Sequence, residues 1–255
     1  MIDVTAVRVS RTRVMPTLLR SFVLAITAAG CSASCGGSSA TSPPSESRAA
    51  PATASSADDT HAAEPRAGGS PAAPPLEEGQ AEAIFAGGCF WCMESPFEEL
   101  DGVRSVTSGY TDGGTPSPTY DEVSSGRTGH TEAVRIVYDP SRITYARLLE
   151  VFWRNIDPTQ SDGQFCDRGT QYRSGIYYRN DEERRLAEAS KQRVAAELEA
   201  EIVTEIDPAS TFWVAEDYHQ DFYRTNPVRY RSYRAGCGRD RRLEALWGRQ
   251  VRDGE

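Results

Sequence analysis

Apolar positions in this chain are concentrated after residue 80, where their spacing alternates between the two-residue period of strands and the longer period of helices. The run at 83–86 predicts a buried strand, and the alternating stretch at 131–138 predicts a strand with one apolar face. Further strands are expected at 103–110, 172–178 and 201–206, and helices at 93–100, 145–155 and 181–201. Strands and helices alternate along the chain, which indicates an α+β domain.

The first third of the chain lacks the apolar content of a core. Arginines precede the short apolar run 22–30, a pattern typical of a secretion signal in residues 1–30, and this run is too short to cross a bilayer. Cys31 follows Ala28-Ala29-Gly30, which resembles a bacterial lipoprotein cleavage box, although Ala28 stands where leucine is usual. Cys35 is a second lipidation candidate, and secretion without lipid is the alternative. We therefore expect an exported protein of the cell envelope or periplasm, held to a membrane only through a lipid anchor.

Composition separates the remaining chain into two parts. Residues 31–80 are rich in Ser, Ala, Pro and Gly and predict a disordered tether, whereas residues 81–250 predict one catalytic domain. The formal net charge is −9 and the arginines are scattered among acidic residues, so no basic stripe is present for nucleic acid. Nucleic acid is therefore excluded as an expected partner.

The most informative motif is Gly-Gly-Cys-Phe-Trp-Cys at 87–92, directly after the first predicted strand. Two glycines predict a tight turn, and helical spacing follows, so Cys89 is expected at a helix N-terminus. Unpaired backbone N–H groups and the helix dipole there stabilise an anion. The pattern predicts that Cys89 ionises easily and acts as a nucleophile.

Glu132 is the carboxylate that the sequence marks most clearly as a candidate for acid–base chemistry. In the strand 131–138 it has the same parity as Val134, Ile136 and Tyr138, so it is expected on their apolar face. Loss of hydration there raises the pKa of a carboxyl and lets it act as a general acid near neutral pH. The alternative is a partly exposed glutamate at a strand end.

Five motifs in this order resemble those of the A-type peptide methionine sulfoxide reductases. They are Gly-Cys-Phe-Trp at 88–91, Gly-Tyr-Thr at 109–111, Pro-Thr-Tyr at 118–120, Gly-His-x-Glu-Ala-Val at 129–134 and Asp-x-Gly-x-Gln-Tyr-Arg-Ser at 167–174. The resemblance implies a two-layer α+β sandwich around a mixed β-sheet with a ferredoxin-like plait core. It also implies a monomer without cofactor or metal that reduces the S epimer of methionine sulfoxide, in proteins and as the free amino acid.

The resemblance implies a role for each matching residue. The Cys89 thiolate would attack the sulfoxide sulfur while protonated Glu132 gives a proton to the oxygen. Tyr120 and Tyr172 would be additional donors, Asp167 would help organise the site, and Phe90 and Trp91 would form the apolar wall that receives the methyl group. Two aromatic residues after a strand are also typical of plain core, which is the alternative for the last pair.

Attack would leave Cys89 as a sulfenic acid, which condenses with a second thiol. Cys92, one helical turn away, is the local candidate for this resolving thiol. Cys237, in a glycine-flanked segment expected to be mobile, is the distal candidate that the resemblance implies. Cys166 is expected to be a small buried residue near the site. A thioredoxin or thioredoxin-like protein would then reduce the disulfide.

Two other classes of protein remain open. A thioredoxin-like thiol–disulfide oxidoreductase also begins with strand, turn, Cys-x-x-Cys and helix, but leaves the Glu132 motif unexplained. A non-catalytic lipoprotein stapled by disulfides would suit an oxidising compartment. One Cys-x-x-Cys without a second pair or spaced histidines is poor evidence for zinc. His130 is therefore expected to support the loop before Glu132, and His219 to lie near the pocket rim.

Overall fold

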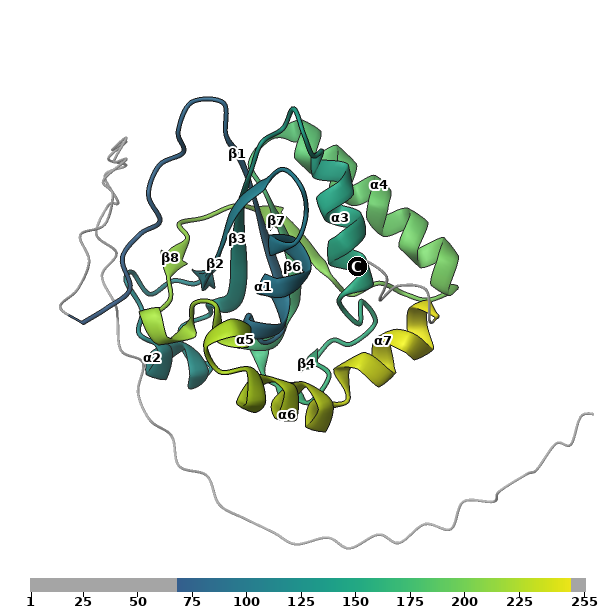
Figure 1. Cartoon of the computed structure of the whole chain (residues 1–255). Coiled ribbons are helices and arrows are strands. Elements are labelled where there is room, and N and C mark those ends of the chain that lie inside the picture. Colours follow the sequence, from purple (N-terminus) through teal and green to yellow (C-terminus); the bar gives the residue numbers. More distant parts are fainter. Residues whose placement is uncertain (1–67, 249–255) are drawn as a thin grey trace, which may run out of the picture. The chain divides into compact units, whose positions relative to one another are not determined.

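A mixed six-stranded β-sheet forms the centre of the described chain, residues 68–248, in a computed structural model (Figure 1). Its strands lie in the order β7-β6-β1-β3-β2-β8, and every adjacent pair is antiparallel except β6 and β7. The bounds are β1 Ala81–Gly87, β2 Val103–Thr111, β3 Thr131–Tyr138, β6 Ser174–Tyr178, β7 Glu205–Pro208 and β8 Trp213–Val214, and a separate small sheet pairs β4 Gly163–Gln164 with β5 Asp167–Arg168. The expected α+β class with a mixed sheet is confirmed.

Three helices pack against one face of this sheet: α1 Trp91–Glu98, α3 Tyr145–Arg154 and α4 Asp181–Leu198. The other helices are α2 Tyr120–Ser124, α5 Phe222–Thr225, α6 Pro227–Cys237 and α7 Arg239–Trp247, and one-turn 3-10 helices span Thr170–Tyr172 and Asp217–His219. In Figure 1, α5, α6 and α7 follow one another around the lower end of the sheet, below α1. The helices α5 and α6 therefore return to α1, the helix that follows Cys89.

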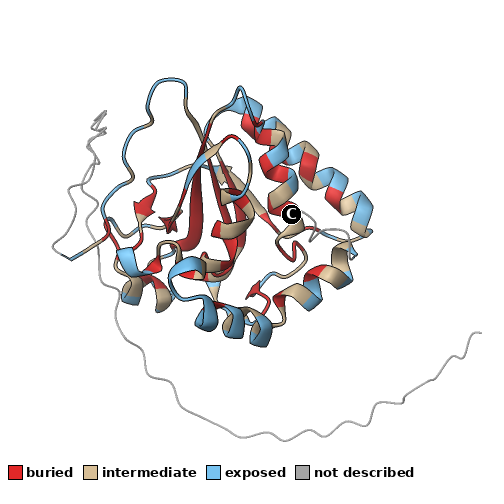
Figure 2. Cartoon of the chain, viewed as in Figure 1, coloured by how far each residue is buried: buried red, intermediate tan, exposed pale blue. Residues whose placement is uncertain are grey.

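Both faces of the central strands are covered, and β1 shows how. Phe85 belongs to the main apolar cluster with Phe97 of α1 and Phe152 of α3. Its neighbour Ile84 points to the opposite face, into a smaller cluster that includes Phe212. Figure 2 accordingly shows the central strands as almost continuously buried. The alternation of side chains along a strand lets one short segment serve both layers.

Most of the predicted elements are present, with differences at their ends. The strand expected at 131–138 is β3 without any shift. The helix expected at 181–201 begins as predicted, where the Asn180 side chain accepts a hydrogen bond from the Glu183 N–H, but it ends early because Glu199 adopts a left-handed conformation with φ of 50°. The strand expected at 172–178 begins only at Ser174, since Tyr172 lies in a 3-10 turn.

The helices α5 to α7 were not expected from the sequence. The segment around Cys237, which was expected to be mobile, is helical in this structure: Cys237 is the last residue of α6 and forms a disulfide with Cys166. Gly238 follows with φ of 71° and ends the helix in the usual left-handed cap. The glycine beside Cys237 thus marks a helix end.

The segment before β1 differs from the expected tether over its last residues. The Ser70 N–H donates to the Pro118 carbonyl at 3.0 Å, and Ala72 forms a β-bridge with Trp213. The Ala73 N–H donates to the Phe212 carbonyl at 2.8 Å. These backbone groups are satisfied by the domain, so the ordered fold begins before residue 81.

The expected signal at 1–30, the lipidation candidate Cys31 and most of the expected tether lie outside the described residues. Within residues 68–248, no helix has both the length and the apolar character that crossing a bilayer requires.

Candidate active site

A turn that requires glycine places Cys89 between β1 and α1. Gly88 has φ of 79°, and a Cβ atom at this position would lie 2.5 Å from the Cβ of Gln164. Cys89 follows at 7 % exposure and directly precedes Phe90, the residue before the first turn of α1. The predicted strand, turn and helix around Cys89 are therefore confirmed.

Glu132 lies on the apolar face of β3, as its parity predicted. The side chain is 2 % exposed, and Val134 and Ile136 of the same face belong to the main core. Its Oε2 accepts a hydrogen bond from the Phe90 N–H at 3.1 Å, which ties the carboxyl to the residue after Cys89. Burial outweighs this bond and raises the pKa of Glu132 to about 8. The carboxyl thus holds a proton at neutral pH.

Cys89 and Cys92 are the free thiols of the described chain, and their side chains share a hydrogen bond. Burial raises the pKa of Cys89, whereas the bond to Cys89 and the nearby Arg239 and Arg234 lower the pKa of Cys92 to about 6. The pair therefore loses one proton readily. The expectation that Cys89 ionises easily at its helix N-terminus is wrong for this thiol taken by itself, because burial, Cys92 and Glu132 raise its pKa.

Two phenols face the same site from different elements. Tyr120 begins α2 and Tyr172 ends a 3-10 turn, and both side chains interact electrostatically with Glu132 and Cys89. Burial raises the pKa of Tyr120 to about 12 and also raises the pKa of Tyr172. Both hydroxyls stay protonated at neutral pH and can donate hydrogen bonds.

The two aromatic residues after Cys89 have different surroundings. Phe90 is 1 % exposed and belongs to the main core, with its ring 4.9 Å from the His219 ring. Trp91 is only partly buried, stacks on Phe222 with ring centroids 3.8 Å apart, and donates from Nε1 to Nδ1 of His219 at 3.1 Å. Trp91 is therefore the more accessible part of the predicted wall.

His219 and His130 have structural roles, each through a hydrogen bond to another segment of the site. His219 is 2 % exposed, and burial lowers its pKa to about 4, so it is neutral and accepts the Trp91 hydrogen bond. It lies behind the aromatic residues and not at an open rim. Nε2 of His130 lies 2.6 Å from the Thr115 carbonyl oxygen, which connects the two ends of the loop before β3.

Asp167 accepts a hydrogen bond from Tyr233, a residue that the sequence did not identify as part of the site. The Tyr233 hydroxyl of α6 donates to Oδ2 of Asp167, and Tyr233 also lowers the pKa of the Cys89 thiol. Burial raises the pKa of Asp167. The stretch around Tyr233 is crowded with arginines and has no clear amphipathic spacing, so no sequence signal pointed to it.

Arg239 is a second residue that the sequence did not identify. This side chain is 1 % exposed, and its Nη2 donates to the carbonyls of Gly87 at 3.0 Å and Asn155 at 2.8 Å. It therefore fixes the turn before Cys89 from the far end of the chain, and its charge acts on Cys92.

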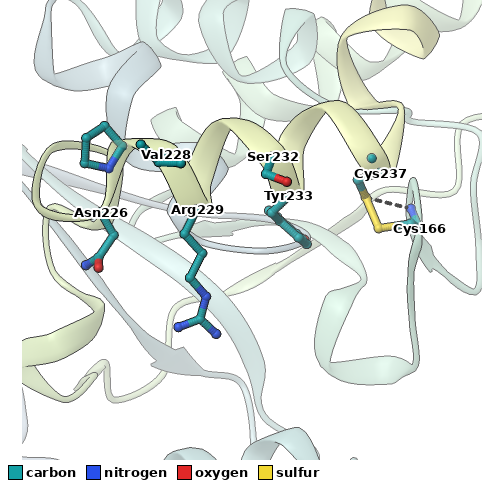
Figure 3. A pocket seen from close by; sticks show the side chains of 9 residues that line it. Cys166, Asn226, Val228, Arg229, Ser232, Tyr233 and Cys237 are labelled. Atoms are coloured by element: carbon teal, nitrogen blue, oxygen red, sulfur yellow. Dashed lines mark hydrogen bonds between the residues drawn. A yellow bond between two sulfur atoms is a disulfide. The ribbon is translucent and has the colours of Figure 1, made fainter.

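Cys166 and Cys237 form a disulfide on the wall of a surface cavity of about 820 Å³ (Figure 3). The expectation that Cys166 is a small buried residue is wrong, because it is exposed on the loop before β5. Within residues 68–248, the group that could approach metal-ligand spacing consists of Cys166, Asp167 and Cys237. Its two sulfurs are bonded to each other and are not thiolate ligands.

A buried pair of free thiols, a protonated carboxyl and phenol donors around one thiol together define a thiol-dependent oxidoreductase that protonates a polar oxygen. The sequence profile of the family described as peptide methionine sulfoxide reductase matches residues 81–251. The chain belongs to this family, which replaces both the thioredoxin-like and the stapled-lipoprotein interpretations.

Relatives and solved structures agree with this family. The chain is similar to the peptide methionine sulfoxide reductase MsrA of Streptococcus agalactiae serotype III, with 59% identity over 58% of this chain and 89% of the relative. It is 51% identical to that of Bacillus subtilis over 68% of this chain and 99% of the relative. It also resembles methionine sulfoxide reductase A of Corynebacterium diphtheriae, with TM-score 0.55, 38% identity, and 60% and 77% of the two chains covered. The reduced form of Mxr1 from Saccharomyces cerevisiae gives TM-score 0.56 and 32% identity, with 58% and 87% covered.

Proposed function

We propose that this chain reduces the S epimer of methionine sulfoxide, in oxidised proteins and as the free amino acid, to methionine. The observation that carries the proposal is the protonated, buried Glu132 held through Phe90 beside the Cys89 thiol. A sulfoxide reductase needs a nucleophile for sulfur and a proton for oxygen in one water-poor site. Family membership supports the same reaction.

The first half of the reaction uses Cys89 and Glu132. The Cys89 thiolate attacks the sulfoxide sulfur, and Glu132 transfers its proton to the oxygen while Tyr120 and Tyr172 donate hydrogen bonds to it. The S–O bond breaks as the bond between Cys89 and the substrate sulfur forms; hydroxide then adds to the Cys89 sulfur as that new bond breaks, so methionine leaves reduced and Cys89 becomes a sulfenic acid. Trp91 and Phe90 receive the methyl group.

The second half joins Cys89 to Cys92. Cys92 is the free thiol beside Cys89, and it holds the one proton that the pair keeps while Cys89 reacts as the thiolate. Attack of Cys92 on the sulfenic sulfur forms the Cys89–Cys92 disulfide, and the proton that Cys92 loses leaves with the hydroxide as water. Cys237 would first have to leave its disulfide with Cys166, so the geometry favours Cys92 as the resolving thiol. A thioredoxin-like dithiol protein then returns two electrons and two protons.

Separate assays of the S and R epimers of a peptide methionine sulfoxide test the reaction, with the full chain and dithiothreitol as reductant. We expect reduction of the S epimer alone, and none by a folded Cys89→Ser variant. If folded protein with a titratable Cys89 thiol reduced neither epimer, the proposed reaction would be wrong.

Two serine variants test the resolving thiol. With the full chain and thioredoxin as reductant, Cys92→Ser should release one methionine per molecule and then stop, whereas Cys237→Ser should continue to turn over. The measurement is methionine released against time. Continued turnover of Cys92→Ser would rule out its assigned role.

The finer description of the fold and the location are also part of the proposal. The strand order β6-β1-β3-β2 supports a two-layer, ferredoxin-like plait as the core of a monomer. The arginine-rich, apolar start of the sequence supports export, with Cys31 lipidated and the domain held in the cell envelope or periplasm. Loss of the protein from the membrane fraction in a Cys31→Ser variant would be the expected result.

A further inference from the structure

The carboxylate of Glu216 joins two separate elements of the site, and the proposed reaction assigns it no role. Its Oε1 accepts a hydrogen bond from the Tyr120 N–H at 2.8 Å, and its Oε2 accepts one from the Tyr110 hydroxyl at 2.7 Å. These partners lie 96 and 106 residues away along the chain. Both oxygens of one side chain are therefore used to connect α2 with β2.

The position of Tyr120 depends on contacts from outside its own helix. The helix α2 has five residues, and so short a helix is not stable by itself. Thr119 and Glu122 cap its start, but they belong to the same segment. Glu216 holds the backbone of Tyr120 from another element, and the ring of His219, on the 3-10 turn that follows Glu216, lies 4.5 Å from the Tyr120 ring. Tyr120 is thus held at its backbone and at its ring by one turn.

The same carboxylate is fixed relative to Glu132. Tyr110 lies directly opposite Glu132 in the pair of β2 and β3, so the two side chains share one face of the sheet. Tyr110 is fully buried, and its hydroxyl bonds to Glu216. Glu216 follows β8, which pairs with β2 at the edge of the sheet (Figure 1). The bonds of Glu216 therefore set where Tyr120 lies relative to the acid.

We propose that Glu216 is a positioning residue that holds the Tyr120 hydroxyl at the sulfoxide oxygen while the Cys89 thiolate attacks. A donor aimed at developing charge stabilises the transition state more than the bound substrate, and misplacement by about 1 Å can cost about 10²-fold in rate. Glu216 acts through Tyr120 and transfers no proton. The inference rests on the proposed function, in which Tyr120 donates to that oxygen, and it adds the residue that places this donor.

The test compares one substitution in two backgrounds, each lacking one phenol. Single turnovers of the reduced full chain with increasing S-sulfoxide give the maximal rate of methionine release and the half-saturating concentration. In Tyr172→Phe, Glu216→Ala should lower the maximal rate about tenfold and leave the half-saturating concentration within about twofold. In Tyr120→Phe, Glu216→Ala should change the maximal rate by less than about twofold, because the hydroxyl that it positions is already absent.

A conservative variant and a matched control accompany this comparison in the Tyr172→Phe background. Glu216→Gln keeps an acceptor for the Tyr120 N–H, and its amide can donate to the Tyr110 hydroxyl, so we expect a rate within about threefold of the background. Asp217→Asn removes the exposed neighbouring carboxylate and should match the background. If Glu216→Ala does not fold, its combination with Tyr110→Phe removes both partners of the buried bond and serves in its place.

Each contrary result overturns the inference for a different reason. Equal losses in the two backgrounds would show that Glu216 supports the fold as a whole. A loss in Glu216→Gln as large as in Glu216→Ala would assign the effect to charge and not to position. An unchanged rate in Glu216→Ala with Tyr172→Phe would show that Tyr120 needs no such support. Failure of the parent to release methionine from the S-sulfoxide would instead overturn the proposed function, and the inference with it.

Discussion

At the scale of single residues, desolvation sets the chemistry. Glu132 and the Cys89–Cys92 pair are nearly free of water, and burial is the leading cause of the raised pKa of Glu132 and of Cys89. Nearby charges and hydrogen bonds then move the pKa values apart. Arg239 and Arg234 lower the pKa of Cys92, whereas they do not act on Glu132. The site therefore holds an acid and a thiolate together near neutral pH.

Replacing Glu132 with glutamine tests the acid. We expect the rate of methionine release to fall by about 10²- to 10⁴-fold, since glutamine hydrogen-bonds but cannot transfer a proton. In the parent, this rate should decline as pH rises through about 8, where Glu132 loses its proton. A parent-like rate in Glu132→Gln, measured in a single turnover across pH, would contradict the assignment.

The same residue predicts how stability depends on pH. The pKa of Glu132 is about 8 in the folded state against 4.5 as the ordinary value, so the folded chain keeps a proton that the unfolded chain has lost between these values. The free energy of unfolding should therefore fall as pH rises from about 4.5 to 8, by about 1.4 kcal/mol for each unit of the difference at most. Buried Glu94, with a pKa of about 8, adds to the same slope.

Glutamine at position 132 cannot ionise, so it removes the loss of stability that Glu132 causes as pH rises. We expect Glu132→Gln to be more stable than the parent at pH 8 by roughly 1–3 kcal/mol and similar at pH 4.5. Urea unfolding at both pH values measures the difference. An equal stability difference at the two values would show that Glu132 is not protonated in the folded state.

At the scale of elements, α6 completes the site although it lies far from Cys89 in the sequence. It delivers Tyr233 to Asp167, and its last residue forms the disulfide to Cys166. The helix is otherwise covered on few sides, and Val228 is 74% exposed at the edge of the cavity. One covalent bond therefore compensates for modest packing.

Removal of this disulfide should cost stability. We expect the double variant Cys166→Ala/Cys237→Ala to unfold with a free energy lower by about 2–5 kcal/mol, because closing a 71-residue loop restricts the unfolded chain. Denaturant unfolding under oxidising conditions measures this change. The parent treated with reductant serves as a control for the substitutions themselves, and an unchanged midpoint in both would contradict the prediction.

At the scale of the described chain, the fold begins before its sequence motifs do. Residues 70–73 bond to the loop at Pro118 and to the segment Phe212–Val214, on the face of the sheet away from the helices. Ala73 packs on the small cluster that contains Phe212 and Ile84. The short strand β8 is therefore held between β2 and the incoming chain.

Two shortened chains test this contribution. A chain that begins at Gly68 keeps the bonds of residues 70–73, whereas one that begins at Gln80 loses them and exposes Phe212. We expect the shorter chain to be less stable by about 1–3 kcal/mol, from the lost burial and hydrogen bonds. Equal melting temperatures would show that these contacts do not support the domain.

Local pattern was enough to predict the catalytic strand–turn–helix. Gly88 before Cys89 and the parity of Glu132 in β3 depend on neighbours within a few residues, and the structure has both as expected. Backbone geometry dictates these features, because a tight turn needs glycine and side chains along a strand alternate. The sequence by itself therefore determined the α+β class, the family and the first half of the chemistry.

Tertiary structure alone decided how the site is completed. Tyr233 reaches Asp167 across 66 residues, Arg239 reaches the Gly87 carbonyl across 152, and Cys166 pairs with Cys237 across 71. No local period records such contacts, since they arise only when the core brings distant segments together. The order in which the thiols ionise was also decided there, because desolvation and nearby charges exist only in the packed molecule.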